Sequence, residues 1–348
     1  MKVAFFTYPS AFQNIGGGEI QLLKTKEYLE KEGVEVHLFD FWRDRVECFD
    51  LLHIFGSVKD CLGLAQTAKS RGIPVAVSPV FWSDFPRAFF MEGSLTERGL
   101  LAMRHLVKII CPIFPSSRRK LLAMADLILP NSEMEKWQIT RLFAVSPEKI
   151  KMVPNAVEVS GTAPNLELFR SRYGPEPFIL SVGRIEPRKN QLNLIRAAKK
   201  IPRMRLVLIG SPVSGYEAYD WKCRREGEGF TTFIPRLNHS DPLLVSALAA
   251  CEVFVAPGWF ETPGLAALEA ALVGCRLAVT SGGSTREYFG EEVEYLDPAS
   301  VSGIHTAIEK ALKEPGSTSL RLKVLENFTW KHAAHKTLEA YQWALASR

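Results

Sequence analysis

Long hydrophobic runs, clustered cysteines and a recognisable leader segment are all missing from this chain. The apolar stretch 106–114 is short and contains Lys108, so no transmembrane helix is expected. The six cysteines are scattered without a Cys-x-x-Cys pair, which argues against a zinc site or a disulfide framework. The N-terminus has no basic segment followed by an apolar core, so no secretory signal is expected. These absences together indicate a cytoplasmic protein.

A strong charge imbalance is also missing. The net charge is only +5 over 348 residues, which permits an anionic ligand or a membrane surface but gives no reason to expect a nucleic-acid partner. Hydrophobic residues make up 47% of the chain, enough for a large core, and the length favours two domains.

Strand-like and helix-like patterns alternate along the whole chain. In the first half we expect strands at 2–7, 34–39, 50–55, 73–78, 126–129 and 150–153, separated by helices. After a polar passage at about 158–177, further strands are expected at 178–182, 205–209, 230–234, 252–256 and 276–280. This pattern predicts an α/β protein with two Rossmann-like, doubly wound domains at 1–157 and 158–327. The apolar helix in 328–348 must dock on another part of the molecule.

Two glutamates eight residues apart stand out in the second half. Glu261 follows the expected strand 252–256, and Thr262 and Pro263 look like the N-cap and first residue of a helix that ends at Gly274. In a parallel sheet, ligands bind at the carboxyl ends of the strands, so Glu261 should face a ligand. The alternative is that both glutamates are solvated surface residues.

Glu269 is expected about 9 Å farther along that helix, at about 1.5 Å per residue from the proline. Between the two carboxylates lie the free amides near Gly264 and Leu265, which favour a phosphate. This spacing suits a nucleotide-sugar, with sugar hydroxyls on one glutamate and ribose hydroxyls on the other.

Cations and glycines supply two further candidates. Arg184 and Lys189 follow the strand 178–182 and could neutralise a diphosphate leaving group, although an ordinary basic corner is the alternative. The glycine loop 16–18 opens a helix after the first strand and could bind phosphate through Gly16 and Gly17, or could be a flexible turn. The loop is not the full dinucleotide fingerprint, which disfavours a dehydrogenase.

As a set, these residues resemble the family 4 (group 1) retaining glycosyltransferases, which have the two-domain GT-B fold. The resemblance covers nearly the whole chain and includes the glycine loop 16–19, the segments 50–53, 125–132, 153–155 and 181–190, the two glutamates, and 328–330 at the start of the final helix. It implies two domains facing across a cleft, with the last helix crossing back to the N-terminal domain.

The resemblance also implies roles for individual residues. Arg184 and Lys189 would hold the donor diphosphate, Glu261 would contact the donor sugar, and Glu269 would hold the ribose. The remaining donor-binding positions would be Gly16, Gly17, Thr262, Gly264 and Leu265 around the phosphates, and Arg236 and Leu237 at the nucleobase. Neither a metal nor another cofactor is expected.

One family feature is missing on the acceptor side. A histidine is common in the loop after the strand 74–78, and this chain has Val80 there. His53 matches another family position and is a catalytic candidate, although a lone histidine on a strand is more often structural. Trp82 and Asp84 are the remaining acceptor-side candidates.

The segment 98–120 combines Lys and Arg with leucine, alanine and isoleucine. Such a basic amphipathic helix can make peripheral contact with the inner face of an anionic membrane. A solvated helix face is the alternative.

The sequence therefore predicts a retaining glycosyltransferase that moves a hexose from a UDP- or GDP-sugar to a hydroxyl of a glycan or lipid-linked acceptor. Front-face transfer, in which the leaving phosphate accepts the proton, needs no second carboxylate. Two alternatives stay open. One is a non-catalytic nucleotide-sugar binding protein or partner subunit, and the other is a nucleotide-sugar epimerase.

Overall fold

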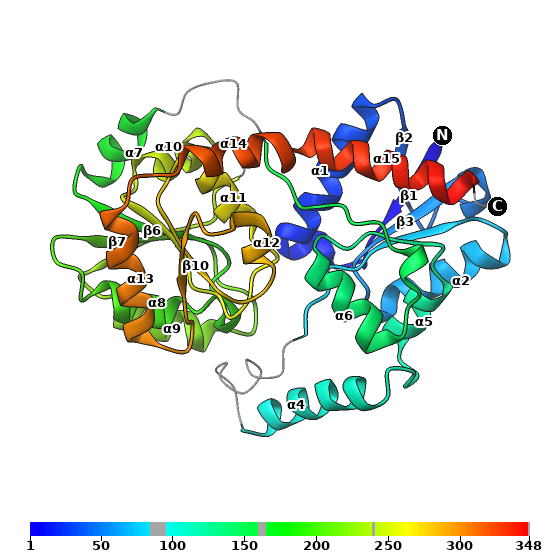
Figure 1. Cartoon of the computed structure of the whole chain (residues 1–348), viewed down its shortest axis with the longest axis horizontal. Coiled ribbons are helices and arrows are strands. Elements are labelled where there is room, and N and C mark those ends of the chain that lie inside the picture. Colours follow the sequence, from blue (N-terminus) through cyan, green and yellow to red (C-terminus); the bar gives the residue numbers. More distant parts are fainter. Residues whose placement is uncertain (84–94, 159–164, 239–240, 347–348) are drawn as a thin grey trace. The chain divides into compact units, whose positions relative to one another are not determined.

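The computed structural model describes residues 1–83, 95–158, 165–238 and 241–346 (Figure 1). The chain forms two compact units. The N-terminal unit contains the chain up to Ala156 and again from Phe328 onward, and the C-terminal unit contains Val157–Asn327. The first unit is therefore built from two separate stretches of sequence.

A five-stranded parallel sheet in the order β2-β1-β3-β4-β5 forms the centre of the N-terminal unit. Its strands are β1 (Lys2–Phe6), β2 (Glu35–Leu38), β3 (Leu51–Phe55), β4 (Val75–Ser78) and β5 (Leu127–Ile128). All residues of β3 and β4 are buried. Near-continuous burial of this kind is typical of a parallel sheet that is covered on both faces.

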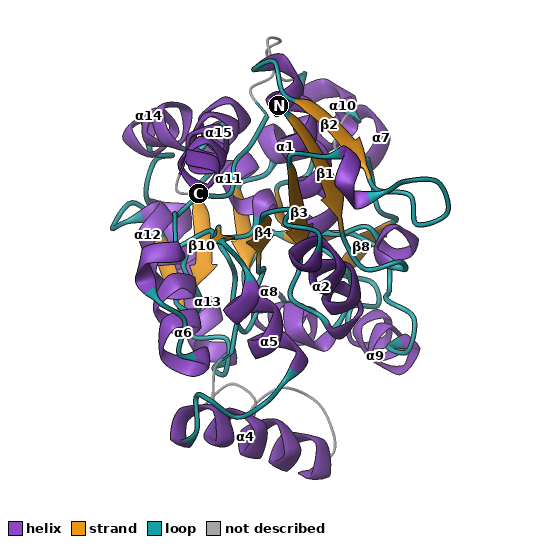
Figure 2. Cartoon of the chain, turned by 90° about the vertical axis from the view of Figure 1, so that its right-hand side faces the viewer, coloured by secondary structure: helices purple, strands orange, loops and turns teal. Residues whose placement is uncertain are grey.

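Helices cover this sheet (Figure 2). They are α1 (Gly17–Lys31), α2 (Leu62–Ser70), α5 (Ser117–Met124), α6 (Glu133–Phe143) and α15 (Trp330–Ala346). Helix α4 (Leu95–Ile110) lies away from the sheet and packs against α6 (Figure 2). Helix α15 packs against α1, and α2 packs against α5. The final helix thus docks on the N-terminal unit and buries Trp330 and Tyr341 there, which accounts for its apolar residues.

The C-terminal unit has a six-stranded parallel sheet in the order β11-β10-β9-β6-β7-β8. Its strands are β6 (Phe178–Val182), β7 (Arg205–Ile209), β8 (Thr231–Ile234), β9 (Val253–Ala256), β10 (Leu277–Thr280) and β11 (Glu294–Leu296). Its helices are α7 (Leu166–Tyr173), α8 (Gln191–Ala198), α9 (Glu217–Glu226), α10 (Pro242–Ala250), α11 (Leu265–Leu272), α12 (Thr285–Phe289), α13 (Val301–Lys313) and α14 (Thr318–Asn327). Helices α8, α9 and α13 pack together, as do α7 with α10 and α11 with α14. The expected α/β class with two Rossmann-like units is confirmed.

Two local expectations were wrong. Residues 150–153 form no strand, because only Ile150 makes an isolated bridge, to Ile128 of β5. Beyond 280 the sheet has one strand more than expected, β11, whose three residues carry too short an apolar pattern to stand out. Short 3-10 turns complete the chain: η1 (Ala11–Asn14), η2 (Val46–Cys48), η3 (Lys59–Cys61), η4 (Pro147–Lys149) and η5 (Pro187–Lys189). Among the described residues, no helix has both the length and the apolarity needed to cross a membrane.

Candidate functional site

A pocket with about 370 Å³ of empty space opens at the carboxyl ends of β6 and β9 in the C-terminal unit. Lys189, Gln191 and Glu261 line it together with three short segments. These are 181–183 at the end of β6, the residues Phe254, Ala256 and Pro257 at the end of β9, and 264–267 at the start of α11. The carboxyl edge of a parallel sheet is where ligands bind in such folds, because helix N-termini and loops converge there. The pocket therefore lies where the sequence placed Glu261.

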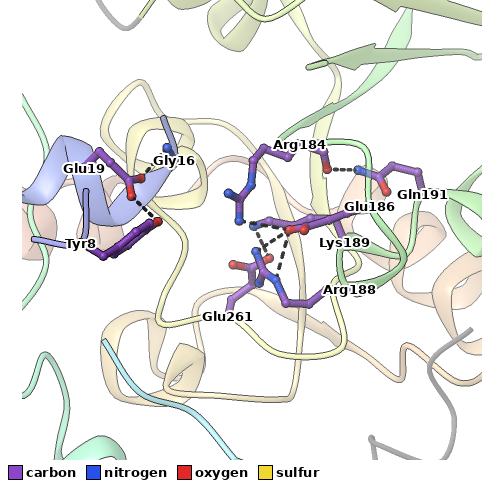
Figure 3. Close-up of polar contacts among 9 residues, drawn as sticks. All are labelled: Tyr8, Gly16, Glu19, Arg184, Glu186, Arg188, Lys189, Gln191 and Glu261. Carbon is purple, nitrogen blue, oxygen red and sulfur yellow. Dashed lines mark hydrogen bonds and ion pairs between the residues drawn. The ribbon is translucent and has the colours of Figure 1, made fainter. Parts of the chain in front are cut away.

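Lys189 and Glu261 form an ion pair in this pocket (Figure 3). The Lys189 ammonium donates to Glu261 Oε1 over 2.7 Å, and the side chains are 20% and 6% exposed. Burial lowers the pKa of Lys189 from its usual value, and the Glu261 carboxylate opposes that shift. The pocket lining thus contains a largely buried ammonium group, which can donate hydrogen bonds to a ligand, and a largely buried carboxylate, which can accept them.

The backbone around Lys189 fixes its direction. The turn η5 carries Lys189, and Asn190 follows it with a left-handed φ of 58°. The Asn190 amide donates to the carbonyls of Pro257 and Pro298, at 3.1 and 2.8 Å. Asn190 stands at the N-cap position of α8, but its side chain binds these two loop carbonyls and makes no capping hydrogen bond to the helix.

Glycine contacts hold Glu261 in place. Its backbone bridges Gly283, and a Cβ atom at Gly283 would lie 1.9 Å from the Glu261 carbonyl. With a φ of 92°, Gly283 also adopts a conformation that other residues rarely reach. No larger residue could occupy this position without moving Glu261.

The helix after Glu261 begins later than expected. Helix α11 starts at Leu265, with Gly264 in the N-cap position at a φ of 91°, so Thr262 is not the N-cap and Pro263 is not the first helical residue. Glycine can adopt this φ where threonine cannot, which explains the shift. The first turn of α11, residues 264–267, lines the pocket, and the first amides of a helix have no partner within the helix.

Glu269 is consequently closer to the helix start than predicted. It is half-buried one turn into α11, only about 6 Å beyond Leu265 at about 1.5 Å per residue. The lining of the pocket ends at Ala267. A ribose contact for Glu269 stays a prediction.

Arg184 belongs to a second charged group beside the pocket. Glu186, which is 8% exposed, accepts hydrogen bonds from Arg184 at 3.4 Å and from Arg188 at 3.0 Å (Figure 3). Gln191 donates to the Arg184 carbonyl at 2.8 Å. Sequence reasoning missed Glu186 and Arg188, although three cations and one carboxylate within six residues were a visible signal.

The other predicted donor residues lie on loops. Arg236 and Leu237 follow β8, and the Arg236 amide donates to Ser211 Oγ at 3.1 Å. In the N-terminal unit, Gly16 caps α1 and Gly17 begins it. The Gly16 amide already donates to Glu19 at 2.7 Å, and Tyr8 donates to the same carboxylate (Figure 3). A phosphate at Gly16 would therefore have to displace Glu19.

His53 is not placed for catalysis, and this corrects the sequence expectation. It is the middle residue of β3 and is 1% exposed. Its Nδ1 hydrogen-bonds with the Tyr341 hydroxyl at 2.5 Å, and its Nε2 with Ser78 Oγ at 2.9 Å. Burial lowers its pKa from 6.5 to about 3, so the ring is neutral near pH 7. His53 is a core residue that joins α15 to the sheet.

The acceptor-side candidates are only partly described. Trp82 is half-buried, while Asp84 lies outside the described residues. Val80, in the position where the family usually has histidine, is 43% exposed and has a φ of 47°. A β-branched residue in the left-handed region is strained, and such strain often gathers near functional sites.

Comparison with known proteins identifies the family. A family model described as "Glycosyl transferases group 1" matches residues 169–328, which cover most of the C-terminal unit and its pocket. The C-terminal unit belongs to the group 1 glycosyl transferases. The expected resemblance is therefore confirmed, and glycosyl transfer is the activity class of this family.

Two kinds of curated enzyme are similar to this chain. The O-antigen chain mannosyltransferase B of Escherichia coli is 26% identical over 73% of this chain and 72% of its own length. The D-inositol 3-phosphate glycosyltransferase of Stackebrandtia nassauensis is 28% identical over 66% of this chain. The match spans only 56% of that second enzyme.

Solved structures share the fold of the whole chain. Sucrose-phosphate synthase from Thermosynechococcus elongatus matches with a TM-score of 0.77 and 18% identity over 100% of both chains. HepE of Anabaena, solved with UDP-glucose, matches with a TM-score of 0.72 and 16% identity over 99% of this chain and 100% of its own. The expected GT-B fold is confirmed.

Proposed function

We propose that this chain is a retaining glycosyltransferase that transfers a hexose from a nucleotide-diphosphate sugar to a hydroxyl of a glycan or lipid-linked acceptor. The observation that carries the proposal is the Lys189–Glu261 ion pair at 2.7 Å, set at the carboxyl edge of the sheet beside the start of α11. HepE was solved with UDP and with UDP-glucose, which supports a uridine donor as the first to test.

Lys189 is proposed to stabilise the diphosphate as it leaves. Negative charge grows on the leaving phosphate during the reaction, so a fixed cation stabilises the transition state more than the ground state. Arg184, held by Glu186, supplies a second cation with a side chain that is 37% exposed. The amides at Gly264 and Leu265 add the positive end of the α11 dipole.

Glu261 is proposed to accept hydrogen bonds from the donor sugar hydroxyls. Its partner Lys189 and its glycine contacts hold the carboxylate in one orientation, so little ordering entropy remains to be lost when the sugar binds. Glu269 and Thr262, the loop at Arg236 and Leu237, and the glycine loop at Gly17 keep the donor-binding roles that the family resemblance implies.

Retention is proposed to follow from front-face delivery of the acceptor. The acceptor hydroxyl attacks the anomeric carbon from the face that the phosphate leaves, and the departing phosphate oxygen takes the hydroxyl proton. No enzyme base is then required, which suits a chain with Val80 where histidine is usual. Trp82 is proposed to contact the acceptor.

Incubation with UDP- and GDP-sugars tests the proposal. A transferase should release nucleoside diphosphate slowly even without acceptor, and NMR of the transferred sugar should show the anomeric configuration of the donor. Nucleotide-sugar binding with no turnover would instead favour a binding protein or partner subunit. A changed sugar still attached to nucleotide would favour an epimerase, and an inverted product would exclude the front-face mechanism.

A further inference from the structure

Helix α4 presents apolar side chains to solvent. Leu95 is 85% exposed and Ile110 is 73% exposed. The other exposed apolar residues of the helix and of the loop after it are Leu100, Met103, Leu106, Ile109, Ile113 and Phe114. In Figures 1 and 2, α4 lies at the outer edge of the N-terminal unit. At 100° per residue, Leu95, Met103, Leu106 and Ile110 fall on one side of the helix.

The inward side of α4 is the more polar one. Ala102 is buried, and His105 Nδ1 hydrogen-bonds with Ser83 Oγ at 2.6 Å. The Lys108 ammonium lies over the Phe81 ring, 5.4 Å from its centroid. A surface helix normally buries its apolar stripe against the core. Helix α4 instead exposes its apolar stripe to solvent, so this stripe can bind another surface.

Cations are concentrated in α4 and in the following helix, α5. Residues 98–125 contain no Asp or Glu and six cations, which are Arg98, Arg104, Lys108, Arg118, Arg119 and Lys120. Within the described parts of the chain, none of the six forms an ion pair with a carboxylate. Cations therefore outnumber acidic residues around the stripe, and Glu97 is the one acidic residue in the sequence of α4.

Two of these cations lie close together. Arg118 sits over the same Phe81 ring as Lys108, 4.8 Å from its centroid, and its Nε donates to the carbonyl and hydroxyl of Ser57, which are neutral acceptors. Burial, with the charges of Arg118 and Arg104, lowers the pKa of Lys108 to about 8. An anion bound next to Lys108 and Arg118 would reduce the repulsion between their positive charges.

We propose that α4 and the loop 111–116 dock on an anionic lipid bilayer. The exposed stripe would enter the boundary between headgroups and acyl chains, and the exposed cations Arg104 and Lys120 would meet the lipid phosphates. A second copy of the chain fits poorly, because pairing two α4 faces would bring six cations against six. The surface does not depend on the donor chemistry proposed above.

Vesicle co-sedimentation of the full chain tests this proposal. We expect binding to vesicles of phosphatidylcholine mixed with phosphatidylglycerol, little binding to phosphatidylcholine alone, and weaker binding at high salt. Ile110→Glu should lower the apparent affinity by about tenfold or more. Arg104→Gln and Lys120→Gln should each lower it by about fivefold. The matched control is Leu322→Glu, a 52% exposed leucine of α14, which should leave binding unchanged.

Three results would overturn the proposal. They are equal binding to neutral and anionic vesicles, no binding to either, and unchanged binding after Ile110→Glu. A dimer that Ile110→Glu dissociates, measured by light scattering, would assign the face to self-association and would also overturn it. If the Ile110→Glu variant does not fold, the vesicle-binding comparison is made with the Arg104→Gln variant instead. Titration of UDP against each variant separates a failure of this surface from a failure of the donor site.

Discussion

Lys189 and His53 are both enclosed titratable side chains in parallel-sheet units, but Lys189 lines a pocket and His53 lies in the core. Lys189 follows the carboxyl end of β6 and meets Glu261 at 2.7 Å. His53 is the middle residue of β3, and both of its ring nitrogens are bonded to side chains of its own unit. Side chains in the middle of a strand are covered by helices, whereas those past its carboxyl end face the ligand crevice. Position along the strand, more than burial, distinguishes a site residue from a core residue.

The largest expected effect on ligand binding comes from Lys189→Ala. Loss of the charge-assisted contact should weaken UDP or GDP binding by about 100-fold, and it leaves Glu261 without its cation. Calorimetric titration measures the affinity. Lys200→Ala, an exposed lysine at the end of the same helical region, is the control and should bind normally. Equal affinities for both variants would remove Lys189 from the site.

His53→Ala should affect stability and leave catalysis nearly intact. The substitution leaves the buried Tyr341 hydroxyl and Ser78 without their shared partner and creates a cavity, so we expect a loss of about 3 kcal/mol. Urea denaturation measures this loss, and donor hydrolysis per folded molecule should stay within about twofold of wild type. A large fall in hydrolysis at unchanged stability would restore His53 as a catalytic residue.

The pH dependence of stability follows from the same histidine. Its pKa is about 3 in the folded chain against 6.5 ordinarily, so between these values the unfolded state takes up a proton that the folded state does not. The contribution is complete above pH 6.5 and is lost as the pH falls, by about 1.4 kcal/mol per unit, or about 2 kcal/mol at pH 5. Urea denaturation of wild type and His53→Gln at pH 5 and at pH 7 measures the free energy of unfolding. This free energy should change less with pH in the variant. Parallel curves would contradict the assignment.

The smallest expected effect extends the comparison to Val80. Asparagine tolerates a left-handed φ better than valine, so Val80→Asn should relieve strain and raise stability by about 1 kcal/mol. Thermal denaturation measures the change, with Val80→Ile as a control that keeps the β-branch. If the asparagine variant also transfers sugar more slowly, the strained loop takes part in acceptor binding.

Sequence patterns predicted the architecture better than the details of the site. Alternating strands and helices gave both parallel sheets, because βαβ units have a strong periodic signal. The start of α11 was misplaced because the left-handed φ of Gly264 depends on the packing of Glu261, which no local pattern records. Lys189 and Glu261 are 72 positions apart, so the sequence could place both at the carboxyl edge of the sheet but could not show that they form an ion pair. The role of His53 depended on Tyr341, another long-range partner.

The discontinuous N-terminal unit affects how the chain matures during synthesis. The stretch that builds the C-terminal unit is continuous from Val157 to Asn327, whereas α15 is made after it and carries Tyr341, the partner of His53. A ribosome therefore delivers everything needed for the C-terminal unit before the N-terminal unit is complete. Until α15 arrives, α1 lacks the helix that packs on it, and the first unit to begin is the last to finish folding.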